Sequence, residues 1–262
     1  MRRPRLGQHF LSDPRVLERI VGHARLRGDE TVLEIGPGRG DLTRLLAAQA
    51  ARVVAIEKDA ELVDDLYDRG LPDNVEVVLG DALKVPLPPF DKCVSNLPYG
   101  ISSDITFRLL EHRFEVAILM FQREFAKRLA APPGSDDYGR LSVNCFVKAT
   151  VETLDTIPPG AFRPPPKVSS LVVRLTPRAQ PPFPIEDQAR FEEVVRAAFQ
   201  HRRKTLRNAL LDQWPAFAAD REALLAALPS LPHLERRAGT LAPQEFEEAA
   251  AALGKAGLRA GG

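Results

Sequence analysis

Short apolar runs rich in β-branched residues alternate, along the first half of this chain, with segments whose apolar residues recur at helical spacing. Strands that alternate with helices form a parallel sheet whose two faces are both covered. The alternation therefore predicts an α/β fold. The predicted strands are Thr31–Ile35, Arg52–Ile56, Val75–Leu79, Lys92–Ser95 and Val116–Phe121, and the predicted helices include Ala60–Arg69, Ile101–His112 and Arg123–Ala131.

The segments that flank this pattern indicate how the sheet begins and closes. Asp13 is a typical helix N-cap and Pro14 suits the first helical position, so an entry helix precedes the sheet. Gly139–Lys148 is compatible with helix or strand, and we predict a helix. Thr150–Ile157 and Ser169–Leu175 lie on either side of a proline-rich segment, which predicts a hairpin at the sheet edge, where proline is tolerated.

A second proline-rich segment, Pro177–Pro184, has the composition of a linker. The chain beyond it is rich in Ala, Leu, Glu and Arg, with helical periodicity. We therefore predict two domains, an α/β domain of residues 1–184 and a small helical domain of residues 185–262.

Composition excludes several classes of protein. The 36 Lys and Arg residues are balanced by 35 acids, so any nucleic-acid surface must be a local patch. Apolar runs such as Val116–Phe121 are far shorter than the roughly 20 residues of a membrane helix, and no signal peptide is evident, which predicts a cytoplasmic protein. Cys93 and Cys145 lie in apolar runs without ligand spacing, so we expect buried thiols and no metal site.

A glycine-rich turn, Glu34–Gly40, follows the first predicted strand and opens a helix. Such glycines allow the backbone to approach a ligand at a helix N-terminus. The dinucleotide fingerprint G-x-G-x-x-G needs its third glycine one residue later than Gly40, and here the acidic Glu34 precedes the first glycine. The spacing favours S-adenosylmethionine over NAD as the cofactor.

Carboxylates also stand at the ends of the next two predicted strands. Glu57 follows the glycines at the distance where a carboxylate can accept hydrogen bonds from both ribose hydroxyls. Asp81 lies where an adenine amino group can donate to it. Each feature alone is equally consistent with a tight turn or a solvated helix cap. Three successive strand ends that converge on one nucleoside favour the cofactor site.

The fourth predicted strand ends in Asn96-Leu97-Pro98-Tyr99, which resembles the target-amine motif of enzymes that methylate a nitrogen conjugated to a ring. The amine of adenine is a poor nucleophile because its lone pair is delocalised into the ring. The Asn96 side-chain oxygen and the Leu97 carbonyl can accept its two N–H bonds, which favours a tetrahedral nitrogen, and Pro98 stiffens the turn. Tyr99 can stack on a flipped base with Phe162 on the opposite face, although a core position is the alternative for both rings.

Together these motifs resemble the ribosomal RNA dimethyladenosine transferase family, and the resemblance extends over nearly the whole chain through Gly7–Leu11, Phe162–Ser170 and Arg202–Asn208. It implies a Rossmann-like S-adenosylmethionine-dependent methyltransferase fold with a small C-terminal helical domain. The implied cofactor residues are Gln8 and Phe10 at the methionine end, Gly36 and Gly38 along the backbone, Glu57 at the ribose and Asp81 at the adenine, together with Lys58, Ala82 and Asn96.

The housekeeping branch of that family dimethylates two adjacent adenines in the 3′-terminal hairpin of small-subunit rRNA. The resemblance thus implies rRNA and the pre-ribosomal small subunit as partners of a monomeric enzyme, and Asp137–Ser142 is most similar to archaeal members. Transfer from a sulfonium needs no metal and no dedicated general base, so the five histidines are interpreted as structural or solvated. The alternatives are a large-subunit rRNA adenine methyltransferase, an assembly factor that acts mainly by binding, and an NAD-dependent oxidoreductase, which leaves Asn96–Tyr99 unexplained.

A basic stripe is the predicted RNA surface. On a helix from Glu192 to about Leu211, Arg196, Arg203 and Arg207 fall within one narrow arc. For an isolated helix a solvated face with paired arginines is the more common explanation. The family resemblance favours contact with RNA phosphates. The predicted RNA-binding residues are Arg196, Arg202, Arg203, Lys204 and Arg207.

Overall fold

The computed structural model describes residues 9–258, which form two compact units. The first unit contains the described residues up to Ala126 together with Ala149–Pro177, and the second contains Lys127–Lys148 and the chain from Arg178 onward. Among the described residues, no helix is both long and apolar enough to cross a membrane.

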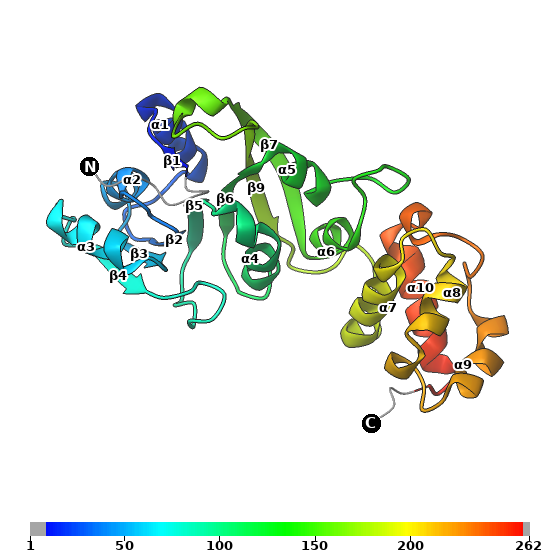
Figure 1. Ribbon diagram of the computed structural model, residues 1–262. Helices are drawn as coiled ribbons and strands as arrows, with labels where there is room; N and C mark the ends of the chain where they lie inside the picture. Colours follow the sequence, from blue (N-terminus) through cyan, green and yellow to red (C-terminus); the bar gives the residue numbers. More distant parts are fainter. Residues whose placement is uncertain (1–8, 259–262) are drawn as a thin grey trace. The chain divides into compact units, whose positions relative to one another are not determined.

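A seven-stranded sheet forms the centre of the first unit (Figure 1), in the order β4-β3-β2-β5-β6-β9-β7. The first five of these strands run parallel, which confirms the predicted α/β class, whereas β9 is antiparallel to both of its neighbours. The predicted hairpin is therefore confirmed, with β7 at the sheet edge. The strands are β2 (Thr31–Ile35), β3 (Arg52–Glu57), β4 (Val75–Leu79), β5 (Lys92–Asn96), β6 (Val116–Gln122), β7 (Ala149–Ile157) and β9 (Ser170–Pro177).

The entry helix α1 (Pro14–Ala24) begins as predicted, because the Asp13 side chain accepts a hydrogen bond from the Arg15 backbone N–H. Its apolar face packs with α2 (Asp41–Ala47) against one face of the sheet in a single hydrophobic core. Before it, β1 (Phe10–Leu11) pairs with β8 (Phe162–Arg163) in a separate two-stranded ribbon. The other helices of this part of the chain are α3 (Ala60–Asp68), α4 (Ser102–Leu109) and α5 (Arg123–Leu129), which ends in the second unit.

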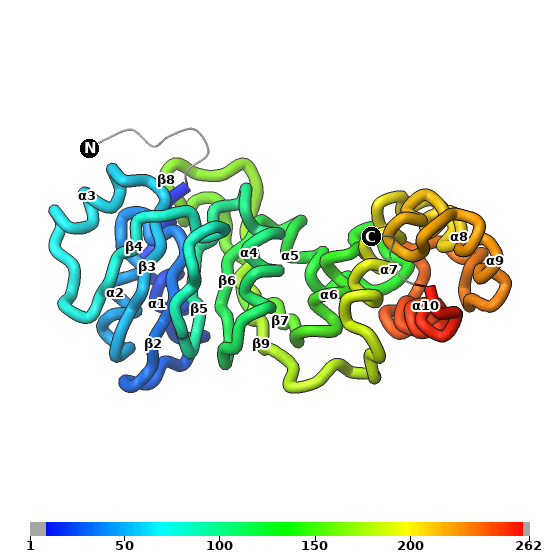
Figure 2. The backbone as a smooth tube through the Cα atoms, turned by 90° about the horizontal axis from the view of Figure 1, so that it is seen from below, coloured from blue at the N-terminus to red at the C-terminus, as the bar shows by residue number. Residues whose placement is uncertain are grey.

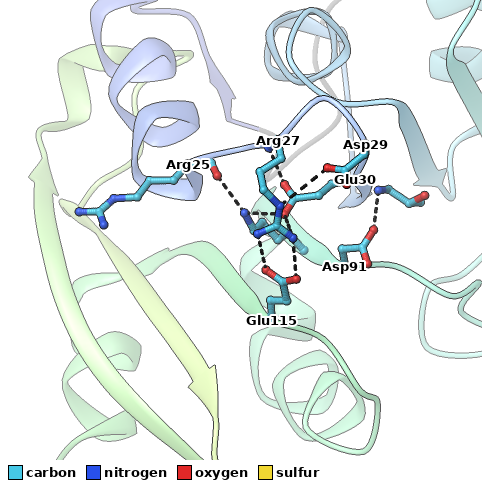
Figure 3. Close-up of polar contacts among 8 residues, drawn as sticks. Arg25, Arg27, Asp29, Glu30, Asp91 and Glu115 are labelled. Carbon is cyan, nitrogen blue, oxygen red and sulfur yellow. Dashed lines mark hydrogen bonds and ion pairs between the residues drawn. The ribbon is translucent and has the colours of Figure 1, made fainter.

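A cluster of charged side chains lies where β2 and β5 begin (Figure 3). Glu30 and Lys92 are 1% and 4% exposed and form an ion pair of 2.8 Å. The Lys92 ammonium also donates to the carbonyl of Arg25 at 2.9 Å. Arg27 then bridges Glu30 and Glu115, at 2.8 and 2.7 Å. The buried charges of Glu30 and Lys92 are thus ion-paired, as burial of charge requires, and Oε2 of Glu30 also accepts a hydrogen bond from the Arg27 backbone N–H at 2.7 Å.

The second unit is helical (Figure 2), and α7, α8 and α10 share one hydrophobic core with α6. The helix predicted for residues 139–148 is confirmed as α6. The predicted boundary at residues 184 and 185 differs from the observed division, because Tyr138, Val143 and Val147 are buried in this second core. The helices are α6 (Arg140–Lys148), α7 (Gln188–Gln200), α8 (Leu206–Asp212), α9 (Arg221–Ala227) and α10 (Pro243–Lys255).

The prediction of one helix from Glu192 to Leu211 is wrong. The helix α7 ends at Gln200 and α8 begins after Thr205, whose side chain caps it by accepting a hydrogen bond from the Asn208 N–H. Thr205 also forms an isolated β-bridge with Arg237, and this pairing competes with helical geometry. Periodicity continued across the break because both helices face the same core.

Candidate active site

A cavity of about 520 Å³ lies at the carboxyl ends of β2, β3 and β5. In open α/β sheets, ligands bind at this edge because the loops that follow adjacent parallel strands meet there. The cavity brings together most of the predicted site residues. Its lining includes Phe10, Gly36, Gly38, Glu57, Lys58, Asn96, Leu97, Pro98 and Tyr99.

The glycine turn presents bare backbone to this cavity. Gly36 and Gly38 have φ angles of +71° and +57°, a conformation that L side chains rarely adopt. A Cβ on Gly36 would lie 3.2 Å from Pro98, and one on Gly38 would lie 3.0 Å from the ring of Phe10. The two glycines are therefore required both by conformation and by close packing, and they leave room for a ligand beside the loop.

Glu57 is held in place by the backbone around it. Its carboxylate is 8% exposed and accepts hydrogen bonds from the N–H groups of Gly38, Lys58 and Asp59, at 3.2, 2.9 and 3.0 Å. A carboxylate has about four acceptor positions, so acceptor capacity remains for a ligand hydroxyl. Glu57 thus links the glycine turn to the end of β3.

Glu34 is a buried carboxyl group that lines the same cavity. It is 2% exposed, and its Oε2 atom has no hydrogen-bond partner among the described residues. Burial raises the pKa of Glu34 to about 8, and the nearby charge of Glu57 adds to the rise. An unsatisfied buried carboxyl is costly in a folded protein, which indicates a site that a ligand completes.

Asp81 lies beside the cavity rather than in its lining. Its Oδ2 accepts a hydrogen bond from the Lys58 ammonium at 2.9 Å, and its Oδ1 accepts one from the Leu83 N–H at 3.0 Å. The bond from Lys58 is the largest of the contributions that lower the pKa of Asp81. Ala82 is buried next to it. The structure therefore connects Asp81 and Ala82 to the site through Lys58.

The Asn96–Tyr99 turn leaves β5 at the cavity wall. Asn96 is partly exposed, and its side chain has no hydrogen-bond partner within the part of the chain that the structure describes. The side chain of Leu97 is buried, so only its backbone is available to a substrate. The Tyr99 hydroxyl is 2.9 Å from the Ser170 hydroxyl, and burial raises the pKa of Tyr99.

Phe162, a candidate for stacking on the target base, lies away from the lining of this cavity. Phe162 is 0% exposed and does not line the cavity. In the β1–β8 ribbon it pairs with Leu11, and both side chains join the hydrophobic core beneath α1. Phe162 therefore occupies the alternative that the sequence left open, a core position.

Sequence reasoning missed several residues that line the cavity, among them His9 and Arg39. His9 was interpreted as structural or solvated, yet its ring centroid lies 6.1 Å from that of Tyr99. Arg39, inside the glycine turn, places its guanidinium carbon 4.7 Å from the centroid of the Phe10 ring. The position of His9 between Gln8 and Phe10 was the available signal. Gln8 itself lies outside the described residues.

Three of the five predicted RNA-binding residues have partners within the second unit. Arg196 pairs with Glu193, Lys204 pairs with Asp212, and the Arg202 guanidinium donates to backbone carbonyls, including that of Ser135 at 2.6 Å. The other two, Arg203 and Arg207, are exposed. Cys93 and Cys145 are buried free thiols, as predicted.

Comparison with known proteins identifies the family. The sequence profile of ribosomal RNA adenine dimethylases matches residues 1–223. The chain belongs to this family. It therefore is a methyltransferase that uses S-adenosylmethionine, as the sequence predicts, and the oxidoreductase alternative is excluded.

Similar proteins support this assignment over most of the chain. A probable ribosomal RNA small subunit methyltransferase A of Methanosarcina acetivorans is 47% identical over 93% of this chain and 90% of its own length. The corresponding protein of Methanopyrus kandleri is also 47% identical, over 96% of this chain and 92% of its own.

Two solved structures are also similar to this chain. A dimethyladenosine transferase from Plasmodium falciparum is 31% identical, with a TM-score of 0.78 and coverage of 95% of this chain and 98% of its own. The 23S rRNA methyltransferase ErmE is 33% identical, with a TM-score of 0.65 and coverage of 94% and 99%.

Proposed function

We propose that this enzyme transfers methyl groups from S-adenosylmethionine to N6 of two adjacent adenines in the 3′-terminal hairpin of small-subunit rRNA, and dimethylates each. The observation that carries the proposal is the 47% identity, over more than nine tenths of the chain, to archaeal proteins named as small-subunit rRNA methyltransferases. The ErmE structure supports the second candidate, a large-subunit rRNA adenine methyltransferase, with a lower TM-score.

The residues of the cavity fit a cofactor that carries positive charge and a ribose. Glu57, Asp41 and Asp59 line it and are acidic, and Glu34 adds a carboxyl group that its raised pKa keeps largely neutral near pH 7. We assign the ribose hydroxyls to Glu57, the methionine end to Phe10, and close passage along the backbone to the two glycines. Asp81, with Lys58 and Ala82 beside it, is assigned to the adenine. When bound, the cofactor supplies an electrophilic methyl group on sulfur.

The Asn96–Tyr99 turn is assigned to the target amine. The Asn96 side-chain oxygen and the Leu97 carbonyl accept the two N–H bonds of the adenine amine, which orients its lone pair away from the ring. The Asn96 side chain has no hydrogen-bond partner among residues 9–258, which supports this role, because a group already hydrogen-bonded to the protein would have to give up a partner. Preorganised acceptors of this kind stabilise a transition state without reorganisation during the reaction.

The primary test is transfer of a radiolabelled methyl group to ribosomal subunits that lack the modification, followed by mapping of the labelled bases. Label on two adjacent adenines of the small-subunit rRNA supports the proposal. Label on the large subunit supports the second candidate instead. An Asn96→Ala variant that still promotes maturation of small subunits would indicate that binding, rather than catalysis, is the principal role.

We also propose that Arg203 and Arg207 contact rRNA phosphates. Replacement of both by Gln should lower RNA affinity and reduce the log–log dependence of binding on salt by about one to two units. The matched control is Arg196→Gln, because Arg196 is paired with Glu193. Identical salt slopes for the parent and the double variant would show that these two arginines do not bind RNA.

The proposed substrate suggests the setting in which the enzyme acts. A pre-ribosomal small subunit is the partner that presents this hairpin, and we propose a monomeric enzyme that meets it in the cytoplasm. Sedimentation of the enzyme alone and with immature small subunits would test both statements, since a monomer and a co-sedimenting complex are expected.

A further inference from the structure

The turn that follows β4 carries the carboxylate assigned to the cofactor adenine, and its residues pack closely on one another. The backbone N–H groups of Lys84 and Val85 both donate to the carbonyl of Asp81, at 2.7 and 2.9 Å. The Leu83 N–H donates to the Asp81 carboxylate at 3.0 Å. A Cβ on Gly80 would lie 2.4 Å from a methyl carbon of Val85, so the end of the turn packs against its beginning. A shift of Val85 is therefore passed on to Asp81.

Two carbonyls of this turn are held by a side chain from a helix. Arg108, on α4, donates from Nη1 to the Ala82 carbonyl at 2.7 Å and from Nη2 to the Val85 carbonyl at 2.5 Å. Within residues 9–258, neither carbonyl accepts a backbone hydrogen bond. A planar guanidinium presents its donors in a fixed fork, which suits two carbonyls at a set separation better than the ammonium of lysine does. Arg108 thus fixes both carbonyls relative to one helix.

The helix that carries Arg108 is itself firmly held. Ile105 and Leu109 of α4 are fully buried. At the beginning of the helix, the buried Ser102 donates from its hydroxyl to the Tyr99 carbonyl at 3.0 Å. One helix is therefore attached to the target-amine turn at its beginning and to the turn after β4 near its end.

We propose that Arg108 is a positioning residue for the adenine of S-adenosylmethionine. By fixing the turn after β4, it sets the direction in which Asp81 accepts a hydrogen bond from the adenine amino group. The proposal deepens the proposed function and rests on it, since Asp81 is assigned to the adenine there. The Lys58 ammonium also contacts the Asp81 carboxylate, at 2.9 Å, but the Lys58 side chain is 76% exposed. Exposed ion pairs of this kind restrain their partners only weakly.

The test compares two ligands of the complete enzyme: S-adenosylhomocysteine, and a counterpart that carries hydrogen in place of the adenine amino group. Calorimetric titration measures both affinities. The parent should bind the counterpart about 10- to 100-fold more weakly, because one hydrogen bond to a charged acceptor is lost. Arg108→Met keeps an unbranched side chain but cannot donate. Its affinity for S-adenosylhomocysteine should fall about tenfold, and the ratio between the two ligands should fall to about threefold.

Arg108→Lys, which can keep one of the two hydrogen bonds, should give an intermediate ratio, and it serves as the test if Arg108→Met does not fold. The matched control is Arg163→Met, because Arg163 also donates to two carbonyls, those of Gly160 and Phe162, each at 3.1 Å, but outside the cavity lining. Both affinities of this control should equal those of the parent. If Arg108 only stabilises the fold, its replacement weakens both ligands by the same factor. An unchanged ratio in the Arg108 variants would therefore overturn the proposal.

Two further results distinguish this role from the proposed function. A parent that binds both ligands equally well would overturn the assignment of Asp81 and, with it, the role of Arg108. Label on large-subunit rRNA in the methyl-transfer assay would instead overturn the proposed substrate. The ratio of ligand affinities would then still decide the role of Arg108, because its measurement involves no RNA.

Discussion

The two ends of strand β2 carry one buried glutamate each, and the two are treated differently. Glu30, just before the strand, is 1% exposed and is paired with Lys92 and Arg27. Glu34, near its carboxyl end, is 2% exposed and has an unpaired oxygen, with a pKa raised to about 8. The same residue type at the same depth is therefore ion-paired with two cations where β2 begins and has no ion pair among the described residues where β2 ends.

Strand β5 repeats the contrast. Lys92 at its beginning forms an ion pair with Glu30 and donates a hydrogen bond to the Arg25 carbonyl, whereas the Asn96 side chain at its end has no partner among the described residues. The end of the sheet where β2 and β5 begin is thus held by ion pairs, whereas the carboxyl end has polar groups that are available to ligands. Functional sites commonly retain such unfavourable features because other parts of the fold stabilise the protein.

Breaking the ion pair where β2 and β5 begin should have the largest effect on stability. Glu30→Gln leaves the ammonium of Lys92, 5% exposed, without a counter-charge, and should lower the free energy of unfolding by about 3–5 kcal/mol. Urea unfolding followed by circular dichroism measures this. The double variant Glu30→Leu with Lys92→Met should recover most of the loss, since a buried pair is often replaceable by apolar residues. A parental midpoint for Glu30→Gln would contradict the assigned role of the pair.

At the carboxyl end of β5, Asn96→Ala should leave the stability of the protein nearly unchanged. It should reduce the rate of methyl transfer by about 10²–10³-fold, which is the loss expected for one preorganised polar contact in a transition state. Single-turnover assays with saturating cofactor and RNA measure the rate. Affinity for the cofactor is the control and should stay close to that of the parent. A parental rate would show that the lone-pair argument is wrong.

Glu57 tests the comparison further, because it lies at the carboxyl end of β3 but already accepts hydrogen bonds from backbone N–H groups. Glu57→Ala removes a charged acceptor and should weaken cofactor binding by about 1–3 kcal/mol. Calorimetric titration measures the affinity. RNA binding should change little, and Glu57→Gln, which keeps one acceptor oxygen, should lose less. Unchanged cofactor affinity in Glu57→Ala would remove this residue from the site.

The effect expected from Glu34 appears only as a dependence of stability on pH. A carboxyl group with a raised pKa holds a proton in the folded protein that the unfolded chain releases between about pH 4.5 and 8, so stability falls as pH rises through this window. Relative to Glu34→Gln, the parent should lose about 2 kcal/mol of unfolding free energy between pH 6 and 8. Urea titrations of both proteins at several pH values test this, and parallel pH profiles would contradict it.

The sequence predicted the carboxyl end of the sheet better than the end where β2 and β5 begin. Glycine turns and strand-end carboxylates lie next to recognisable strands, so Glu34, Glu57 and Asn96 could be placed from local pattern alone. The pairing of Glu30 with Lys92 joins a residue just before β2 to the first residue of β5 and carries no local signal. The burial of Phe162 was hidden for the same reason, because it depends on the pairing of β8 with β1.

The helical part of the chain shows the same limit. Periodicity correctly identified the helices on either side of His201–Thr205, but it could not detect a break between two helices that share one core. The sequence also did not show that α6 belongs to that core, since the helices with which it packs come after β7 and β9 in the chain. Local pattern specified the elements, and tertiary contacts decided where they end and what they cover.

The placement of α6 bears on how this enzyme could be cut or recombined. Because Lys127–Lys148 belongs to the second unit, the chain leaves the first unit, returns to it at Ala149 and leaves again after Pro177. A fragment that starts at residue 185 lacks Tyr138, whose hydroxyl donates to the Leu241 carbonyl at 2.8 Å inside the helical core. A chimera that exchanges the helical unit between relatives must therefore graft two separate segments. In the sequence, the β7–β9 hairpin lies between these two segments, so the helical unit cannot be exchanged as a single C-terminal piece.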